Sequence, residues 1–452
     1  STFTFHFNML LLFCFEKFNV GDSQRVYLDS PSGIQSILTR VTGNDVSDIM
    51  GTLGVTGGAD LFLINPNGMV FGESARLDVG GSFVATTADQ VQFETFGLFS
   101  SRNPESPSSL LTIAPSAFLF GSESSGSIVN RSAIATTYND APGEVIGLRV
   151  PNGETLGFLG GDVRVNGGGM SALGGRIEIA AVAGEGQVDI DEILRFQISD
   201  DVLLGNVRLQ NDAVVDTAWG GGGDIRVFGN TIDIVSSVLQ SGIRADQDVP
   251  GKRAGTIFLS GAERIRMRGV SELAQSHDRL TAGVSNSVEQ NSIGEAGAIT
   301  IVTPLLRIAG GAQLNASIFG QGDTGLISIS ASDRIIIDGT SENQDSISGI
   351  FALTNMRGRG DPGKIRITTP VLRVRNGAQI SSSVMGEGNG QTITINAADL
   401  VMLDGSSADD AIASGIFSTL SGSGLGRAGR IQINTPILNI RNGARITSST
   451  LG

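Results

Sequence analysis

Apolar and polar residues alternate over short segments in the C-terminal half of the chain. Between residues 299 and 318 these segments are ITI, LLRI and QLNASI, and an alternation with a period of two is typical of half-buried β-strands. Thr-Pro, Gly-Gly and Gly-Gln-Gly follow the three segments in turn, and proline and glycine at such positions interrupt strands with turns. The pattern therefore predicts three short strands in this stretch.

The stretch recurs at a fixed spacing of 66 residues. Three copies, beginning at Gly297, Gly363 and Gly429, align without gaps, and each full period divides into a unit of 27 residues and a unit of 39. Similar units begin at Gly223 and Gly255. We therefore expect seven coils, which begin at residues 223, 255, 297, 324, 363, 390 and 429.

Three strands in each short repeat, without a helical period, are typical of a parallel β-helix. We predict an all-β chain that folds as a right-handed parallel β-helix of three-strand coils, with successive coils hydrogen-bonded about 4.8 Å apart. A leucine-rich repeat is one alternative, but the regular Leu/Asn consensus that it needs is absent. Amyloid-like stacking is the other alternative.

The N-terminal third has a different composition from the repeats. Fifteen of the 21 phenylalanines lie before residue 160, and large rings fill irregular space, whereas the repeats are rich in Ile, Val and Leu. A terminal coil also needs a cap, because it exposes the edge of a sheet. We predict an irregular capping module over residues 1–160, transition coils over 161–222 and a repetitive stalk over 223–452.

Composition narrows the chemistry that the chain can perform. The formal net charge is −14, which disfavours nucleic acid and anionic membrane surfaces as partners. Cys14 is the single cysteine, and His6 and His277 are the only histidines, so neither a disulfide nor a Cys/His metal cluster can form within the chain. We expect a protein that is not an enzyme, with no catalytic residue, no metal, no cofactor and no integral membrane segment.

Several sequence blocks in the N-terminal module occur in a fixed order. Residues 51–89 read GTLGVTGGADLFLINPNGMVFGESARLDVGGSFVATTAD, and two shorter blocks, Phe18-Asn19-Val20 and Arg40-Val41-Thr42-Gly43, precede them. Together the blocks resemble the secretion domain of the filamentous haemagglutinin family, the passengers of two-partner secretion systems. The sequence after Gly174 is similar to the passengers of the cyanobacterial-type members.

The resemblance implies a function for one turn in this module. It implies that Asn65, Pro66, Asn67 and Gly68 form a secretion motif that an outer-membrane two-partner secretion transporter engages. The residues themselves also support a purely structural role, because Asn-Gly adopts positive φ readily and Asn65 can cap the turn. Where better-known members carry a second such turn, this chain has Ser30, Pro31, Ser32 and Gly33, which we take as a secondary motif.

The repeats also contain polar residues that could act at a site. Asp338 and Asp404 recur at the 66-residue spacing, and stacked carboxylates could bind calcium or perform acid–base chemistry on a polysaccharide. Asp-Gly is equally an ordinary turn pair. Phe351 and Phe417 are expected to stack as an apolar ladder, and the Ser/Thr-rich segments, among them 381–383, are expected on an outer face that suits glycans.

The leading hypothesis is a secreted or surface-displayed, adhesin-like protein that is exported through the outer membrane, with a glycan or another cell-surface ligand. The alternatives are a polysaccharide-active β-helix enzyme and the carrier stalk of a C-terminal contact-dependent toxin. Residues 447–452 match residues 381–386, inside a coil. We therefore expect the chain to be a fragment that is truncated at its C-terminus.

Overall fold

A computed structural model describes residues 3–7, 9–94, 97–104, 114–123, 125–137, 144–272 and 282–450. All elements whose bounds it gives are β-strands. The chain divides into two compact units: unit 1 comprises Ser1–Arg208, Ala213–Asp216 and Val227–Asn230, and unit 2 comprises Leu209–Asp212, Thr217–Arg226 and Thr231–Gly452. Within the described residues there is no helix with the length and apolar character needed to cross a membrane.

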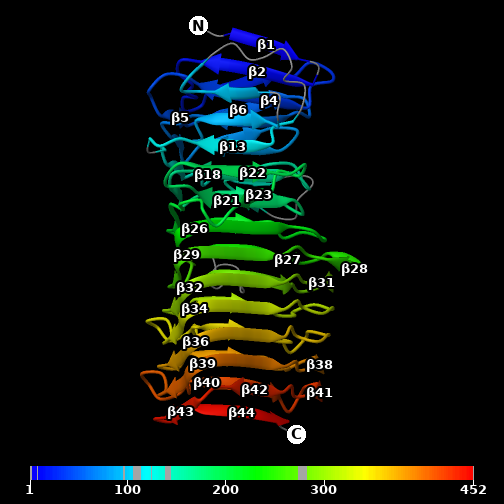
Figure 1. The fold of residues 1–452 in the computed structure, drawn as a ribbon. Helices are drawn as coiled ribbons and strands as arrows, with labels where there is room; N and C mark the ends of the chain where they lie inside the picture. The colour runs from blue at the N-terminus through cyan, green and yellow to red at the C-terminus, as the bar shows by residue number, and fades with distance from the viewer. Residues whose placement is uncertain are drawn as a thin grey trace. The chain divides into compact units, whose positions relative to one another are not determined.

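The main sheet of unit 1 is a parallel ladder of six strands that are not consecutive in the chain (Figure 1). Its order is β2 (Leu10–Phe15), β4 (Ser36–Val41), β7 (Asp60–Ile64), β10 (Phe83–Thr86), β18 (Thr155–Gly160) and β21 (Arg176–Ala181). One column of facing residues runs through all six strands, and every member is at most 1% exposed: Leu11, Ile37, Leu61, Phe83, Leu156 and Ile177. Such in-register stacking of apolar side chains is the core of a parallel β-helix.

Two further parallel ladders complete the coils of unit 1. One joins β5 (Ser47–Ile49), β8 (Met69–Phe71), β14 (Ile128–Asn130) and β19 (Val163–Asn166). The other joins β3 (Arg25–Asp29), β6 (Thr52–Thr56) and β9 (Arg76–Asp78). Shorter elements are β15 (Ala135–Thr137), β16 (Glu144–Ile146), β17 (Leu148–Arg149), β20 (Gly169–Ser171), β24 (Asn206–Gln210) and β25 (Val214–Asp216).

Antiparallel pairing makes unit 1 irregular. Strand β1 (Phe3–Phe7) pairs antiparallel with β2 and covers its edge. A separate antiparallel sheet contains β11 (Gln90–Phe93), β12 (Gly97–Ser100), β13 (Ala117–Phe120), β22 (Gly186–Ile190) and β23 (Phe196–Ile198). Phe118 of this sheet contacts Phe62 of the main sheet, with ring centroids 6.4 Å apart. The aromatic rings therefore fill the space between the two sheets.

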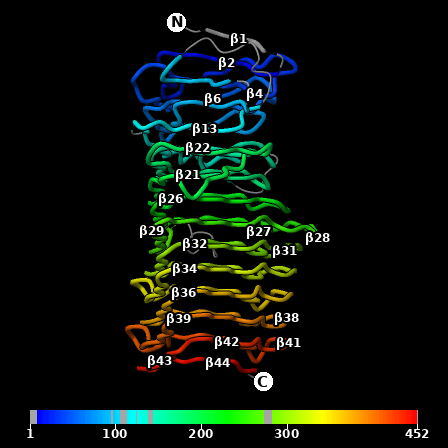
Figure 2. Tube along the Cα trace, in the orientation of Figure 1, coloured from blue at the N-terminus to red at the C-terminus, as the bar shows by residue number. Residues whose placement is uncertain are grey.

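Unit 2 is a stack of seven coils, as the repeats predicted (Figures 1 and 2). Each coil contributes one long strand, and the seven are β26 (Asp224–Val235), β29 (Ile257–Arg268), β32 (Ile299–Ala309), β34 (Ile327–Asp338), β36 (Ile365–Arg375), β39 (Ile393–Asp404) and β42 with β43 (Ile431–Asn434, Ile437–Arg441). From β29 onward these long strands pair in parallel with one another. The prediction of an all-β, parallel β-helix is confirmed.

A second ladder in unit 2 contains one strand from each coil. These strands are β27 (Val238–Ile243), β30 (Gly283–Val288), β33 (Gln313–Asn315), β35 (Gly349–Phe351), β37 (Gln379–Ser381), β40 (Gly415–Leu420) and β44 (Arg445–Thr450). Two smaller pairs join β28 (Asp248–Arg253) to β31 (Ile293–Glu295), and β38 (Glu387–Asn389) to β41 (Leu425–Arg427).

The prediction that Thr-Pro separates two short strands is wrong for the inner coils. In β32 the segments on either side of Pro304 form one continuous strand, and the register with β34 shifts between Thr303 and Leu305. Proline is tolerated at such a bulge because no ladder hydrogen bond is required of its nitrogen. Only the last coil divides as predicted, into β42 and β43.

The core of unit 2 is built from columns of identical or similar side chains. Ile257, Ile299, Ile327, Ile365 and Ile393 face one another across successive coils, and each is at most 1% exposed. The apolar side chains at this position therefore stack directly, as the sequence period requires.

Two expectations about other columns are corrected. Ser381 lies between Phe351 and Phe417 in the ladder, so the two rings do not stack on each other. Ser382 is fully buried and Ser381 and Ser383 are 6% and 7% exposed, so this Ser-rich segment does not form an outer face. The hydroxyl groups of Ser381 and Ser383 bond to each other at 2.9 Å inside the coil stack, as expected for buried polar groups. The Ser382 carbonyl accepts from Ser418 Oγ at 3.1 Å.

Candidate functional site

The segment Asn65–Gly68 forms a tight turn directly after β7. The amide of Gly68 donates to the carbonyl of Asn65 at 3.1 Å, which closes the turn, and Gly68 has a φ of 117°. The Asn65 side chain supports it from within, because its Oδ1 accepts from the amide of Asn67 at 3.0 Å. Asparagine and glycine thus occupy the positions at which this turn needs a side-chain cap and a positive φ.

Hydrogen bonds hold the turn against the preceding coil. Asn65 is fully buried, and its Nδ2 donates to the Asp45 carbonyl at 3.0 Å and to Ser47 Oγ at 2.9 Å. Asn67 Nδ2 donates to the Gly43 carbonyl at 2.8 Å. The two asparagine amides therefore hold together segments that lie about twenty residues apart in the chain.

The following coil packs against the other side of the turn. The Gly126 amide donates to the Pro66 carbonyl at 2.8 Å. A Cβ atom on Gly126 would lie 2.2 Å from the backbone carbon of Asn67, a separation that the fold cannot accommodate without a backbone shift. Asn65, Pro66 and Gly68 are buried, whereas Asn67 is partly accessible. The folded turn therefore presents Asn67 to solvent and keeps its other residues inside.

Two upstream sequence blocks converge on the same region. Val20 of the first block is fully buried, and its amide donates to the Asp48 carbonyl at 2.9 Å. The neighbouring Asn19 side chain accepts from the Asp48 amide at 2.8 Å. Since Ser47 binds the side chain of Asn65, one continuous hydrogen-bonded path connects the first block to the turn.

The second block contributes a buried arginine. Arg40 is 4% exposed, and its guanidinium donates to the Ser100 carbonyl at 2.6 Å and lies 4.3 Å from the centre of the Phe99 ring. Its Nε also lies 3.0 Å from Cys14 Sγ. These contacts tie the main sheet to the antiparallel sheet, so Arg40 and Cys14 act in packing.

The secondary motif has no comparable support. Pro31 and Ile34 close a turn through one hydrogen bond of 3.2 Å. Pro31, Ser32 and Gly33 are exposed, and a Cβ on Gly33 would meet nothing within 4 Å. Ser30 contacts Thr56, so the structure does not bring Ser30–Gly33 to the turn at Asn65–Gly68.

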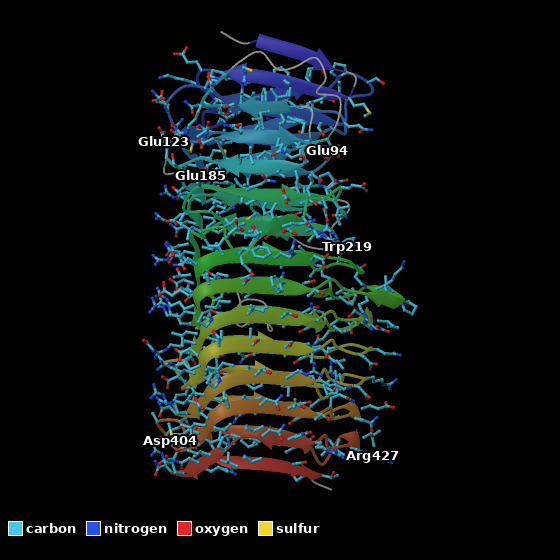
Figure 3. The ribbon with its side chains drawn as sticks, in the orientation of Figure 1. Glu94, Glu123, Glu185, Trp219, Asp404 and Arg427 are labelled. Carbon is cyan, nitrogen blue, oxygen red and sulfur yellow. The ribbon has the colours of Figure 1, made fainter. Side chains whose placement is uncertain are left out.

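A pocket of about 230 Å³ opens beside the main turn. Pro66, Asn67, Gly43 and the charged residues Arg102 and Glu123 are among the residues that line it. Arg102 pairs with Glu123 at 2.8 Å and with the buried Asp89. Figure 3 marks Glu123 at the edge of the ribbon. No local sequence pattern connects these charged residues or Gly126 to the turn, so their position beside it could not be predicted.

The recurring carboxylates of unit 2 are engaged in ion pairs. Asp338 pairs with Arg375 at 2.8 Å, and Asp404 pairs with Arg441 at 2.7 Å. The hydrogen bond from Arg441, with one from Asn442, holds the pKa of Asp404 below its ordinary value. Within the described residues no group of His, Cys, Asp and Glu is placed to hold a metal ion, and His277 lies outside those residues. Asp338 and Asp404 therefore act as partners of arginine between coils.

Comparisons with known proteins point to the same module. The sequence model of the TPS secretion domain matches residues 8–227. The Heme/hemopexin-binding protein of Haemophilus influenzae is 36% identical over 73 residues, which are 16% of this chain and 8% of that protein. The chain therefore aligns with only a small part of that relative's length.

A solved structure has the same fold. The HMW1 secretion domain from Haemophilus influenzae superposes with a TM-score of 0.50 and 16% sequence identity, over 98% of this chain and 97% of that one. At this identity the match supports the fold alone. The family match covers the turn at Asn65–Gly68, its neighbours in adjacent coils and the antiparallel sheet. Residues 8–227 of this chain match the TPS secretion domain family, and the resemblance to two-partner secretion passengers is confirmed.

Proposed function

We propose that the chain is exported through an outer-membrane two-partner secretion transporter, and that unit 2 is an adhesin-like stalk without enzymatic activity. The observation that carries the proposal is the match of residues 8–227 to the TPS secretion domain. The protein would then be secreted or displayed at the cell surface. The transporter is its first partner, and a glycan or cell-surface group is the ligand of the stalk.

The folded geometry indicates how the turn would take part. Three of the four residues of Asn65–Gly68 are buried in the folded chain, so a transporter that contacts all four must meet them before the coils close. After folding, Asn67 and the neighbouring Arg102 and Glu123 remain accessible beside the pocket. We assign early recognition to the unfolded turn and later contact to this accessible group.

Folding outside the cell would then draw the chain outward. Each completed coil offers an open sheet edge to the next segment, and each added coil buries apolar side chains, which stabilises it by about 25 cal/mol per Å². The fully buried isoleucine column of unit 2 provides such burial at every step. No ATP is needed for this bias.

An export assay tests the proposal. The full chain, with a cleavable signal peptide added, is co-expressed with a two-partner secretion transporter, and the protein in the medium is measured for the parent, for Asn65→Ala/Asn67→Ala and for Gly126→Ala. The Gly126 variant distorts the turn but keeps its side chains. If the transporter recognises the asparagines, the double variant loses export beyond what its thermal stability accounts for, whereas Gly126→Ala loses export only in step with stability. Equal export of parent and double variant would refute recognition of the turn.

A further inference from the structure

A groove in unit 2 gathers arginine side chains in a chain that is otherwise acidic. It has a volume of about 880 Å³ and lies where β29 and β32 end, with the loop after β34 as one wall. The lining residues that matter here are Arg266, Arg268, Arg307, Ser341, Glu342 and Asn343. The surface of the groove thus contains three guanidinium groups and one carboxylate.

The β-helix register places these arginines close together. Arg266 and Arg307 are direct partners in the parallel ladder, which sets their backbones about 4.8 Å apart. Arg268 lies two residues further along β29, on the same face. Like charges directly opposite each other are unfavourable, so the fold keeps this cluster against an electrostatic cost.

The neighbouring carboxylates neutralise the cluster only in part. Arg266 pairs with the buried Asp233 at 3.0 Å. Arg307 reaches Asp338 at 3.4 Å, but Arg375 holds the same carboxylate oxygen at 2.8 Å. Arg268 forms no ion pair with any residue that the structure describes. Because a guanidinium carries five N–H donors, Arg268 and Arg307 retain donors that can bind an anionic group.

The loop wall is formed before any ligand arrives. Ser341 Oγ donates to Asn343 Oδ1 at 2.7 Å, and Asn343 Nδ2 donates to Asp345 at 2.7 Å. The Ser346 amide also donates back to Ser341 Oγ at 2.9 Å. A wall that is already ordered costs little conformational entropy on binding. Its hydroxyl and amide groups also match the hydroxyl groups of a sugar.

We propose that this groove binds an anionic glycan, with Arg268 and Arg307 holding its carboxylate or sulfate groups. Planar guanidinium groups bind both anions through paired hydrogen bonds. Single-stranded nucleic acid is disfavoured as ligand, because none of the described residues that line the groove is aromatic, and bases are bound largely by stacking on aromatic rings. The inference names the ligand class of the adhesin-like stalk and rests on that proposed function for its biological meaning. Binding itself is measured on purified protein and does not depend on export.

The test is calorimetric titration of the full chain at low and physiological salt. The probes are polygalacturonate, dextran sulfate, fully methyl-esterified polygalacturonate and single-stranded DNA. The variants are Arg268→Ala, Arg307→Ala and Glu342→Gln, with Arg427→Ala as the matched control. Arg427 is also exposed, and Figure 3 shows it on the flank of unit 2 opposite to Asp404. Far-ultraviolet circular dichroism and the melting temperature of each variant establish that it is folded.

We expect binding of polygalacturonate or dextran sulfate, and whichever binds more tightly identifies the anionic group. Arg268→Ala and Arg307→Ala should each weaken binding by about tenfold, Glu342→Gln should strengthen it, and Arg427→Ala should leave it unchanged. Affinity should fall as salt rises. Equal binding of the methyl ester, equal binding of DNA, an equal loss in Arg427→Ala, or no binding at all would each overturn the proposal. A failed export assay would leave this result unaffected.

Discussion

The carboxylate of Asp338 holds two successive coils of unit 2 in register. It accepts hydrogen bonds from Arg375 Nη2 and Asn376 Nδ2, both at 2.8 Å, and the Asp338 side chain is 12% exposed. Hydrogen bonds to a charged group contribute about 1.5–3 kcal/mol each. Arg375 is 39% exposed, so water screens part of its interaction. We expect Asp338→Ala to lower the free energy of unfolding of these coils by about 2 kcal/mol.

The same strand offers a matched control. Asp333 pairs with Arg334 at 2.8 Å, but the two side chains are 52% and 47% exposed. Exposed pairs contribute less than about 1 kcal/mol, because water and salt screen them. Asp333→Ala also removes one carboxylate from β34, and it should change the free energy of unfolding by less than about 0.5 kcal/mol.

Hydrogen exchange is the suitable assay, since a stack of coils need not unfold in one step. We expect amide exchange in β36 to become about thirtyfold faster in Asp338→Ala, which corresponds to about 2 kcal/mol. Exchange in β18 of unit 1 should not change. If Asp333→Ala accelerated exchange in β36 as much as Asp338→Ala, the assignment of the clamp to Asp338 would be refuted.

Three further predictions concern the turn and two carboxylates. Gly126→Ala should destabilise unit 1 by about 1–3 kcal/mol in urea unfolding, because its Cβ would overlap the backbone of Asn67. Gly58→Ala is the control and should not change the stability, because nothing lies within 4 Å of its Cβ. Hydrogen bonds from Arg441 and Asn442 lower the pKa of Asp404 below 3.8, so the stability that this carboxylate contributes is present above pH 3.8 and is lost as the pH falls through the lowered pKa. In Asp404→Asn, acidification should no longer cause this part of the rise in amide hydrogen exchange of β43. Burial raises the pKa of Asp60 above 3.8, so the stability of the fold decreases as the pH rises from 3.8 through the raised pKa. Asp60→Asn keeps an acceptor for the Ser82 amide. This variant should not show the decrease and should have a higher melting temperature at pH 7.

The repeats could be predicted from the sequence because each coil repeats one local pattern. All seven coil starts precede the first residue of a long strand by one to three positions. The continuity of strands through Pro304 could not be predicted, since it depends on a register shift against the neighbouring coil. The buried position of Ser381–Ser383 has the same origin, because alternation within one segment does not say which face lies inside the stack.

The candidate site was predictable only in its local part. Asn65–Gly68 carries its own turn signal, so the closing hydrogen bond and the positive φ of Gly68 follow from residue types. Its partners Asp45, Ser47 and Gly126 come from adjacent coils, and no short-range pattern identifies them. The arginine groove likewise depends on the register that pairs Arg266 with Arg307. The export role of the turn and the domain boundaries at residues 160 and 222 stay predictions.

The two kinds of coil in unit 2 are complementary at one edge, and this restricts how such a chain can change in length during evolution. In each 39-residue coil the long strand ends with Asp338 or Asp404, and the coil after it supplies Arg375 or Arg441. Deletion of the single coil between β34 and β39 would bring Asp338 beside Asp404, two like charges in direct opposition. Loss of the pair of coils that contains β36 and β39 would instead bring Asp338 beside Arg441 and keep opposite charges together. We expect related genes to differ in this region by multiples of one 66-residue period.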